Sequence, residues 1–284
     1  MFRYRWPARF LPLPLWAASR LSPSEIFPEV RFGTTFSQLQ CRYLGLDYRD
    51  TFRQICGLGF DRIRLCAYWN EIEPQPNQFD FTVLDWLLEE CDRQQIQVVL
   101  ALGMKTPRWP EFHFPDWISQ RHETGAGSKP LDQRSPALAE ATLTWLSAVV
   151  QHLRHAPALA YWQIENEPFT RLEITGGRFL SPAFIRREVA LLRELAAQPL
   201  LLTGSIALPS ANAPEDEAAL QDCLTLADAV GLNVYSKVPL GQTRYYLEPQ
   251  PAFWQTLERW QIQIHQAQKS AWIAEAQAEP WEPH

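Results

Sequence analysis

The chain has 284 residues, of which 46% are hydrophobic and 20% charged, so it can bury a sizeable core and is not intrinsically disordered. Its formal net charge of −6 argues against a protein that binds nucleic acid by neutralising phosphates. Its apolar runs all fall short of the roughly 18 residues that a membrane-spanning helix needs, so we expect no membrane span.

The five cysteines form no C-x-x-C pair, which argues against a zinc ribbon or a redox motif. Cys66 lies inside an apolar run, and the simplest interpretation of all five is buried, reduced thiols. Reduced thiols are typical of a reducing compartment, so a cytoplasmic location is favoured. The sequence shows neither an H-E-x-x-H motif nor an acidic calcium loop, and we expect no metal and no other cofactor.

Residues 1–30 differ in character from the rest of the chain. Three arginines within the first nine residues precede a short apolar stretch at 10–18, a pattern that resembles a weak secretion signal. Pro12 and Pro14 interrupt that stretch and argue against a signal. A leader peptide and a plain extension both stay open for residues 1–30, and secretion therefore stays open beside the cytoplasmic alternative.

From residue 31 onward, short β-rich apolar runs alternate with longer stretches of helical period. Strands that are continuous apolar runs are buried on both faces, which is typical of parallel sheets. We predict seven such strands, at 31–36, 62–67, 97–102, 158–164, 199–204, 229–235 and 271–275.

The stretches between these runs predict amphipathic helices. Apolar residues recur with helical spacing at 84–91, 146–153 and 253–264. Ser135 and Ser181 each stand before a proline, and a capping hydroxyl followed by proline is a common helix start. Thr82 and Asp85 have the spacing of a capping box.

Seven β-α alternations in one chain predict an α/β fold of the (β/α)8 TIM-barrel type, with residues 31–284 as a single domain. A doubly wound open sheet is the alternative, but no G-x-G-x-x-G or other phosphate-binding loop follows the first strand. A last helix and an eighth strand would have to follow Glu275, and residues 276–284 are too short for them. We therefore expect a barrel that lacks its eighth strand and is C-terminally incomplete. Unpaired strand edges invite association, so self-association through an open barrel edge is a further expectation.

Polar residues end two of the predicted strands. Glu165, Asn166 and Glu167 follow the apolar run at 158–164, and Glu275 ends the last run. The carboxyl ends of barrel strands carry the active site, so these side chains are expected on one face of the barrel. Two carboxylates so placed suit acid–base and nucleophilic chemistry on a glycosidic bond.

The segment WQIENEP at 162–168 resembles the fourth-strand motif of the clan A glycoside hydrolases, a large group of retaining (β/α)8 enzymes. Its WQIxNE part is similar to that of the β-galactosidase families 35 and 42, and its NEP part to that of the family 5 cellulases and mannanases. The resemblance implies that Glu167 is the acid/base, that Glu275 is the nucleophile, and that Asn166 holds the 2-hydroxyl of the sugar.

Two further stretches carry this resemblance, which extends over roughly residues 31–281. IRLCAYWNEIEP at 63–74 is similar to the second-strand stretch of the clan and implies that Arg64 supports the nucleophile. GLNVY at 231–235 resembles the end of the sixth strand and nominates Tyr235, whose hydroxyl would orient Glu275. The departure from the clan is the missing eighth strand, which usually carries a tryptophan that forms a floor for the sugar.

Several of these residues keep a second interpretation. Glu165 is an alternative acid, because strict strand alternation places it on the same face as Glu167. Arg64 is alternatively an ion-pair partner in the core, and Tyr235 an ordinary packing residue. His113 is a candidate for a sugar contact, because it lies in the long connection 103–134, which is expected to cover the active-site face.

Twelve tryptophans are many for this length, and indole rings stack on the C–H faces of sugars as well as packing in cores. Trp162 and Trp272 lie early in predicted strands and are expected in the core. The candidates for stacking on a sugar lie at or beyond strand ends and are Trp69, Trp109, Trp117 and Trp281.

The leading hypothesis is a retaining glycosidase that hydrolyses β-glycosidic bonds of an oligo- or polysaccharide by a two-glutamate double displacement. The alternative is a catalytically impaired or non-catalytic carbohydrate-binding barrel, which is favoured if the missing strand abolishes turnover. A carbohydrate is the expected partner under both hypotheses, and neither involves a nucleic acid. The sugar, the linkage and the choice between endo and exo cleavage stay open.

Overall fold

The computed structural model describes residues 30–170, 175–206, 213–235, 238–239, 246–247, 249 and 251–277. Seven strands of this part form one parallel sheet, in the order β1 (Gly33–Thr35), β2 (Arg62–Cys66), β3 (Gln97–Leu102), β4 (Leu159–Ile164), β5 (Leu200–Ile206), β6 (Ala229–Tyr235) and β9 (Ser270–Gln277). Each of the seven predicted apolar runs forms one of these strands, which confirms that prediction. The leader or extension predicted at the N-terminus lies outside the described residues, except for Val30.

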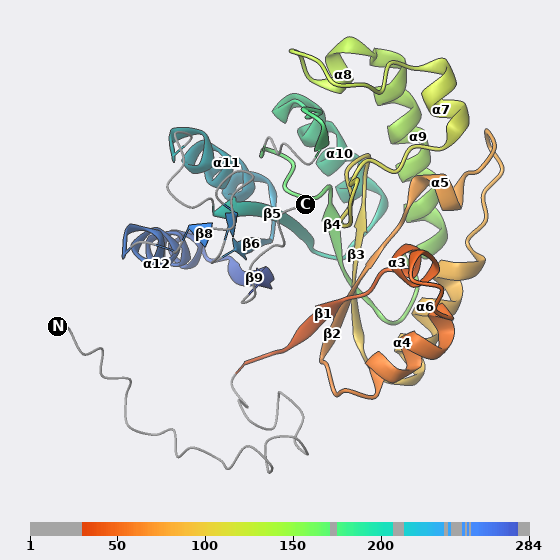
Figure 1. Cartoon of the computed structure of the whole chain (residues 1–284), viewed down its shortest axis with the longest axis horizontal. Coiled ribbons are helices and arrows are strands. Elements are labelled where there is room, and N and C mark those ends of the chain that lie inside the picture. Colours follow the sequence, from red (N-terminus) through yellow and green to blue (C-terminus); the bar gives the residue numbers. More distant parts are fainter. Residues whose placement is uncertain are drawn as a thin grey trace.

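Helices connect the strands and cover the convex side of the sheet, which curls like part of a barrel (Figure 1). They are α3 (Gln38–Tyr43), α4 (Tyr48–Cys56), α5 (Trp69–Ile72), α6 (Thr82–Arg93), α7 (Asp116–Arg121), α8 (Leu131–Arg134), α9 (Pro136–Leu153), α10 (Pro182–Leu195), α11 (Ala213–Leu226) and α12 (Pro251–Gln266). A short antiparallel pair, β7 (Val238–Pro239) and β8 (Tyr246–Leu247), lies in the connection between β6 and α12.

The two edges of the sheet are β1 and β9, and within the described residues no strand pairs with the second side of either. The protein is therefore an α/β barrel of seven described strands, as the sequence predicts. The main core lies between the sheet and its outer helices, where the apolar stripes of α6, α9 and α12 are buried.

A smaller apolar layer fills the concave side of the sheet near the amino ends of the strands. Tyr161 of β4 and Trp272 of β9 pack there against aliphatic side chains, with their ring centroids 4.7 Å apart. The guanidinium of Arg62 from β2 lies 4.5 Å from the Trp272 ring, which connects opposite sides of the curled sheet. This layer lies toward the amino ends of the strands, whereas the candidate site lies at their carboxyl ends.

A β-bulge in β9 turns Glu275 into the barrel. Leu232 of β6 pairs with Ile273, but Asn233 pairs with Glu275, so Ala274 is an extra residue in β9. Without the bulge, strict alternation would send Glu275 to the opposite face from Trp272, which lies three residues earlier. Ile273 is 56% exposed on the outer face, whereas Trp272 and Glu275 both face the concave side.

The predicted helix starts are confirmed in part. Ser181 caps α10, because its hydroxyl accepts a hydrogen bond from the backbone N–H of Phe184 at 3.2 Å. Ser135 precedes α9 but its hydroxyl makes no such bond. The capping box is wrong, because Thr82 is already the first residue of α6, and Asp85 instead accepts from His152 of α9.

All five cysteines are free and buried in the structure, as predicted. Their burial explains why they need no partner, since a thiol behaves as a small apolar group in a core. Among the described residues no helix is long and apolar enough to cross a membrane.

Candidate active site

The residues predicted to carry chemistry meet at the carboxyl ends of the strands. Glu167 follows β4 by three residues, Glu275 lies near the end of β9, and Tyr235 is the last residue of β6. Arg64 reaches this region from the middle of β2. The fold thus brings together four side chains that are up to 211 positions apart in the sequence.

Glu275 is held by two hydrogen-bond donors. Nη2 of Arg64 lies 2.7 Å from its Oε1, and the hydroxyl of Tyr235 donates to its Oε2. Arg64 is buried and also donates to Thr35 of β1 and to Gln163 of β4, so its guanidinium is fixed by three strands. The charged guanidinium of Arg64 therefore lies directly beside the Glu275 carboxyl group.

Glu167 is almost fully buried, at 3% exposure, and lies in a different environment. Burial raises its pKa to about 7, and the charges of Glu275 and Glu111 act in the same direction, whereas Lys105 opposes them. The amide of Asn233 donates to its Oε1 at 2.8 Å and fixes the carboxyl group. A carboxyl group with a pKa near 7 is suited to donate a proton at neutral pH.

Glu165, the alternative acid, points away from this cluster. Its two oxygens accept hydrogen bonds from the backbone N–H groups of Met104 and Lys105 in the loop after β3, at 2.8 and 2.5 Å. The strand ends at Ile164, and Glu165 and Glu167 both have positive φ, so strict alternation does not extend to them. Burial also raises the pKa of Glu165 to about 7, but its carboxyl group is hydrogen-bonded to the backbone of the loop after β3.

Gly103 permits this arrangement of the β3 loop. Its φ is +136°, and a Cβ at this position would lie 2.3 Å from the Glu165 carboxyl carbon. Only glycine therefore allows the backbone to approach that carboxylate so closely.

Asn166 is buried and belongs to a polar cluster with Glu111, Lys105 and Glu167. Its Nδ2 donates to Oε1 of Glu111 at 3.0 Å, and its backbone N–H donates to the carbonyl of Lys105 at 2.6 Å. Nζ of Lys105 lies 3.4 Å from Oε2 of Glu111 and 3.2 Å from the carbonyl oxygen of Glu167. Asn166, predicted to hold a sugar hydroxyl, is thus tied to the candidate acid through a buried ion pair.

His113 lies in the loop after β3 and is buried against the ring of Tyr68, with ring centroids 4.6 Å apart. Its Nε2 lies 3.1 Å from the carbonyl oxygen of Arg108. Burial lowers the pKa of His113 to about 4, so the ring is neutral at pH 7. A contact of this ring with a sugar stays a prediction.

The structure separates the predicted stacking tryptophans. Trp69 is only 1% exposed, stacks on Trp145 with centroids 5.2 Å apart and donates to Glu73. The prediction that Trp69 stacks on a sugar is therefore wrong, because the core already covers its ring. Trp117 is partly buried and donates to the Glu73 carbonyl, Trp109 is 69% exposed, and both stay candidates. Trp281 lies outside the described residues.

Three members of this cluster were not predicted from the sequence, namely Lys105, Glu111 and Asn233. Strand alternation could have found Asn233, which lies two residues before Tyr235 in β6 and shares its face. No sequence signal marks Lys105 or Glu111, because they lie in a loop whose path depends on positive φ at Arg108 and Glu111.

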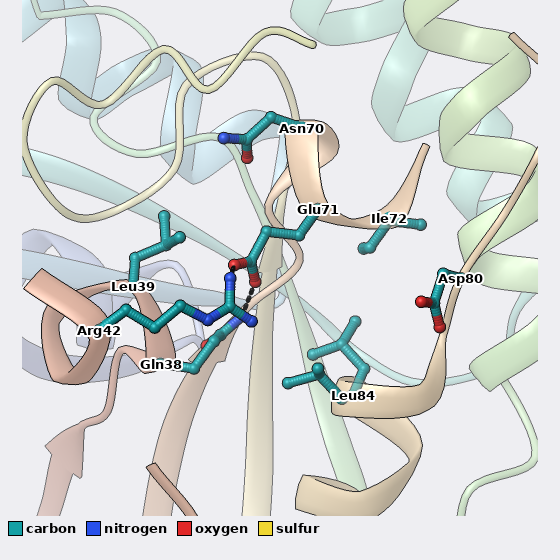
Figure 2. A pocket seen from close by; sticks show the side chains of 9 residues that line it. Gln38, Leu39, Arg42, Asn70, Glu71, Ile72, Asp80 and Leu84 are labelled. Carbon is teal, nitrogen blue, oxygen red and sulfur yellow. Dashed lines mark hydrogen bonds and ion pairs between the residues drawn. The ribbon is translucent and has the colours of Figure 1, made fainter. Parts of the chain in front are cut away.

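A cavity of about 300 Å³ opens beside α3, α5 and α6, away from these residues (Figure 2). Two acidic residues line it, Glu71 and Asp80, and Figure 2 shows Glu71 bonded to Arg42 and Gln38. These bonds connect the segment after β2 to helix α3. In the described residues no cluster of three His, Cys, Asp or Glu side chains is arranged to hold a metal ion.

Part of the chain is similar to known glycoside hydrolases. Residues 47–175 match the glycoside hydrolase family 42 model, described as β-galactosidase. Over this segment the chain is similar to clan A glycoside hydrolases. The matched segment includes Arg64, Asn166 and Glu167 and ends before Tyr235 and Glu275.

Two curated β-galactosidases are similar to this chain over part of its length. The enzyme from Xanthomonas manihotis is 27% identical over 130 residues, which are 42% of this chain and 21% of that protein. BgaH from Haloferax lucentense is 28% identical over 121 residues, which are 40% of this chain and 18% of that protein. The matches therefore span about a fifth of the length of these curated relatives.

Solved structures share the fold at low sequence identity. The β-galactosidase from the psychrophilic Marinomonas ef1 aligns with a TM-score of 0.62 and 16% identity, over 90% of this chain and 50% of that one. A family 10 endo-β-1,4-xylanase from Gloeophyllum trabeum aligns with a TM-score of 0.58 and 18% identity, over 89% of this chain and 75% of that one. At these identities, both alignments show a shared fold.

Proposed function

We propose that the protein hydrolyses β-glycosidic bonds with retention of configuration, using Glu167 as acid/base and Glu275 as nucleophile. The observation that carries this proposal is the contrast between the two carboxyl groups. Glu275 is bonded to the Arg64 guanidinium and to Tyr235, whereas burial raises the pKa of Glu167 to about 7. A carboxyl group held by an arginine suits a nucleophile, and a buried carboxyl group with a raised pKa suits a proton donor.

In the first step, a Glu275 oxygen attacks the anomeric carbon while the bond from that carbon to the leaving oxygen breaks. The proton of Glu167 moves to the leaving oxygen, so the leaving group departs as an alcohol. Arg64 and Tyr235 fix the plane of the Glu275 carboxylate. Fixing that plane lowers the entropic cost of reaching the attack geometry.

The second step reverses these roles. Glu275 has become a neutral glycosyl ester, so its negative charge no longer raises the pKa of Glu167. Glu167 is then the base that takes a proton from water, and the water oxygen attacks the anomeric carbon. The ester bond breaks, Glu275 returns to the carboxylate, and the product keeps the β configuration. This mechanism requires the two carboxyl groups to lie about 5–5.5 Å apart in the working enzyme.

The names of the curated relatives make β-galactosides the first substrates to test. The full chain is incubated with 4-nitrophenyl β-galactoside, and the first-formed anomer of the released sugar is read by proton NMR. We expect β-galactose to form first, and Glu275→Ala to abolish release. First formation of the α anomer would show inversion and contradict the proposal. The panel includes the matching β-glucoside, β-mannoside and β-xyloside, since the sugar is open.

The alternative function, a carbohydrate-binding barrel without turnover, has a separate outcome in the same experiment. It predicts equal, background hydrolysis by the wild type and by Glu275→Ala. It also predicts that galactosides quench tryptophan fluorescence in a saturable manner, because exposed Trp109 lies in the loop after β3. Turnover by the wild type excludes it.

A further inference from the structure

Glu111 occupies an unusual position in the loop after β3. It is a non-glycine residue with φ of +66°, and its side chain is buried, with the whole residue 8% exposed. Both features cost free energy, and residues held in such conformations cluster at functional sites. The backbone around it is fixed, because its N–H donates to the Arg108 carbonyl and its carbonyl accepts from the N–H of Thr106.

The hydrogen bond to Glu111 sets the orientation of the Asn166 amide. A carboxylate only accepts hydrogen bonds, so the Nδ2 side of Asn166 must face Glu111 and Oδ1 must face the other way. Oδ1 of Asn166 is buried, and no described residue donates a hydrogen bond to it. Oε2 of Glu111 is in the same state, although the Lys105 ammonium lies 3.4 Å away.

Buried acceptors without donors are costly and indicate a missing hydrogen-bond donor. A sugar hydroxyl is such a donor, and the candidate acid Glu167 is adjacent to Asn166 in the chain. Lys105 compensates the buried charge of Glu111 and also donates to the Glu167 carbonyl, so the loop and the acid are held as one unit.

We propose that Glu111 is a positioning residue, which fixes the amide of Asn166 so that it meets the hydroxyl on the second carbon of the sugar. This inference rests on the proposed function, in which Asn166 holds that hydroxyl. The rival explanation is that Glu111 only ties the β3 loop to the end of β4.

The test compares Glu111→Gln with the wild type on two substrates, an aryl β-galactoside and its 2-deoxy analogue. The new amide cannot accept from Asn166 without turning its own N–H groups toward Lys105, so the Asn166 amide loses its fixed orientation. We expect kcat/KM on the parent substrate to fall by about 10–100-fold, the range for a lost hydrogen bond to a charged group. The loss should lie mainly in kcat, because contacts to the 2-hydroxyl strengthen in the transition state.

On the 2-deoxy substrate the same variant should lose less than about threefold, because the contact that Glu111 supports is absent there. Asn166→Ala should show the same pattern. Glu123→Gln is the matched control, since Glu123 lies in the same connection, 58% exposed at its side chain, and should leave both rates unchanged. Equal losses on the two substrates would overturn the proposal and favour the purely structural tie.

A second measurement does not depend on turnover. The side-chain amide resonances of Asn166, assigned by their loss in Asn166→Ala, should shift in Glu111→Gln and stay in place in Glu123→Gln. An unchanged resonance in a folded Glu111→Gln would overturn the inference. If the wild type hydrolyses no glycoside, the proposed function fails by itself, and the amide resonance alone decides whether Glu111 orients Asn166.

Discussion

Arg64 of β2 donates to Glu275 of β9 across the concave side of the sheet, over a distance of 2.7 Å. These two strands are not neighbours, because β2 is second and β9 is last in the order of the sheet. Arg64 also bonds to Thr35 of β1. Through this one guanidinium, the first edge of the sheet is connected to the candidate nucleophile on the last.

The first prediction concerns the acid. Glu167→Ala removes the proton donor but leaves the nucleophile, and an aryl leaving group of low pKa needs little protonation to depart. The first step should therefore survive on 2,4-dinitrophenyl β-galactoside, and the glycosyl-enzyme should accumulate in a mass spectrum. Azide, which needs no base, should restore turnover and give the β-galactosyl azide.

Glu275→Ala should respond in the opposite way. It forms no covalent intermediate, and azide that takes the place of the carboxylate should give the α-galactosyl azide. The same anomer from both variants would contradict the two roles. Full activity of Glu167→Ala on unactivated galactosides would move the acid to Glu165.

The second prediction is a pH profile. Because burial raises the pKa of Glu167 to about 7 and the acid must be protonated in the free enzyme, kcat/KM should fall as pH rises through about 7. Glu167→Gln should lose this alkaline limb on an activated substrate. Glu165→Gln is the control, because burial gives Glu165 a similar pKa although it faces the backbone of the β3 loop. If the limb disappears in Glu165→Gln and persists in Glu167→Gln, the assignment is reversed.

The third prediction concerns stability. Glu188 of α10 is fully buried, and burial and the neighbouring Glu165 charge raise its pKa well above 4.5. The folded protein therefore holds a proton that the unfolded chain releases near pH 4.5, so this stabilising contribution is lost as pH rises through the raised pKa. Glu188→Gln avoids that loss and should raise Tm by roughly 2–10 °C above pH 7, with a smaller gain at pH 5.

Glu194→Gln is the control for this measurement, because Glu194 lies on the exposed side of the same helix. Its Tm difference from the wild type should stay flat with pH. A Glu188→Gln difference that is equally flat would show that Glu188 does not titrate in this range.

The fourth prediction concerns the open edge of the sheet. β9 pairs with β6 on one side only in the described residues, and unpaired edges associate. Sedimentation velocity should show concentration-dependent association of the wild type, and Ile273→Lys on β9 should reduce it. Ile262→Lys, at a similarly exposed isoleucine of α12, should have no effect. A wild type that stays monomeric at every concentration would contradict this prediction.

The sequence predicted all seven strands, because buried parallel strands are continuous apolar runs that few other elements imitate. It also identified Arg64, Tyr235 and Glu275, which the structure joins by hydrogen bonds. It failed for Trp69, since position at a strand end does not reveal that Trp145 will cover the ring. It could not find Glu111, whose place depends on a loop path that no periodicity encodes.

The bulge at Ala274 has a further consequence for how activity is lost on heating. Glu275 faces Arg64 only while β9 keeps its irregular register, and β9 is one of the two edge strands of the described sheet, paired with β6 on one side. Releasing or slipping one edge strand costs less free energy than melting the whole core. The arrangement that places Glu275 beside Arg64 is therefore less stable than the fold as a whole. On heating, activity should be lost before the protein unfolds globally.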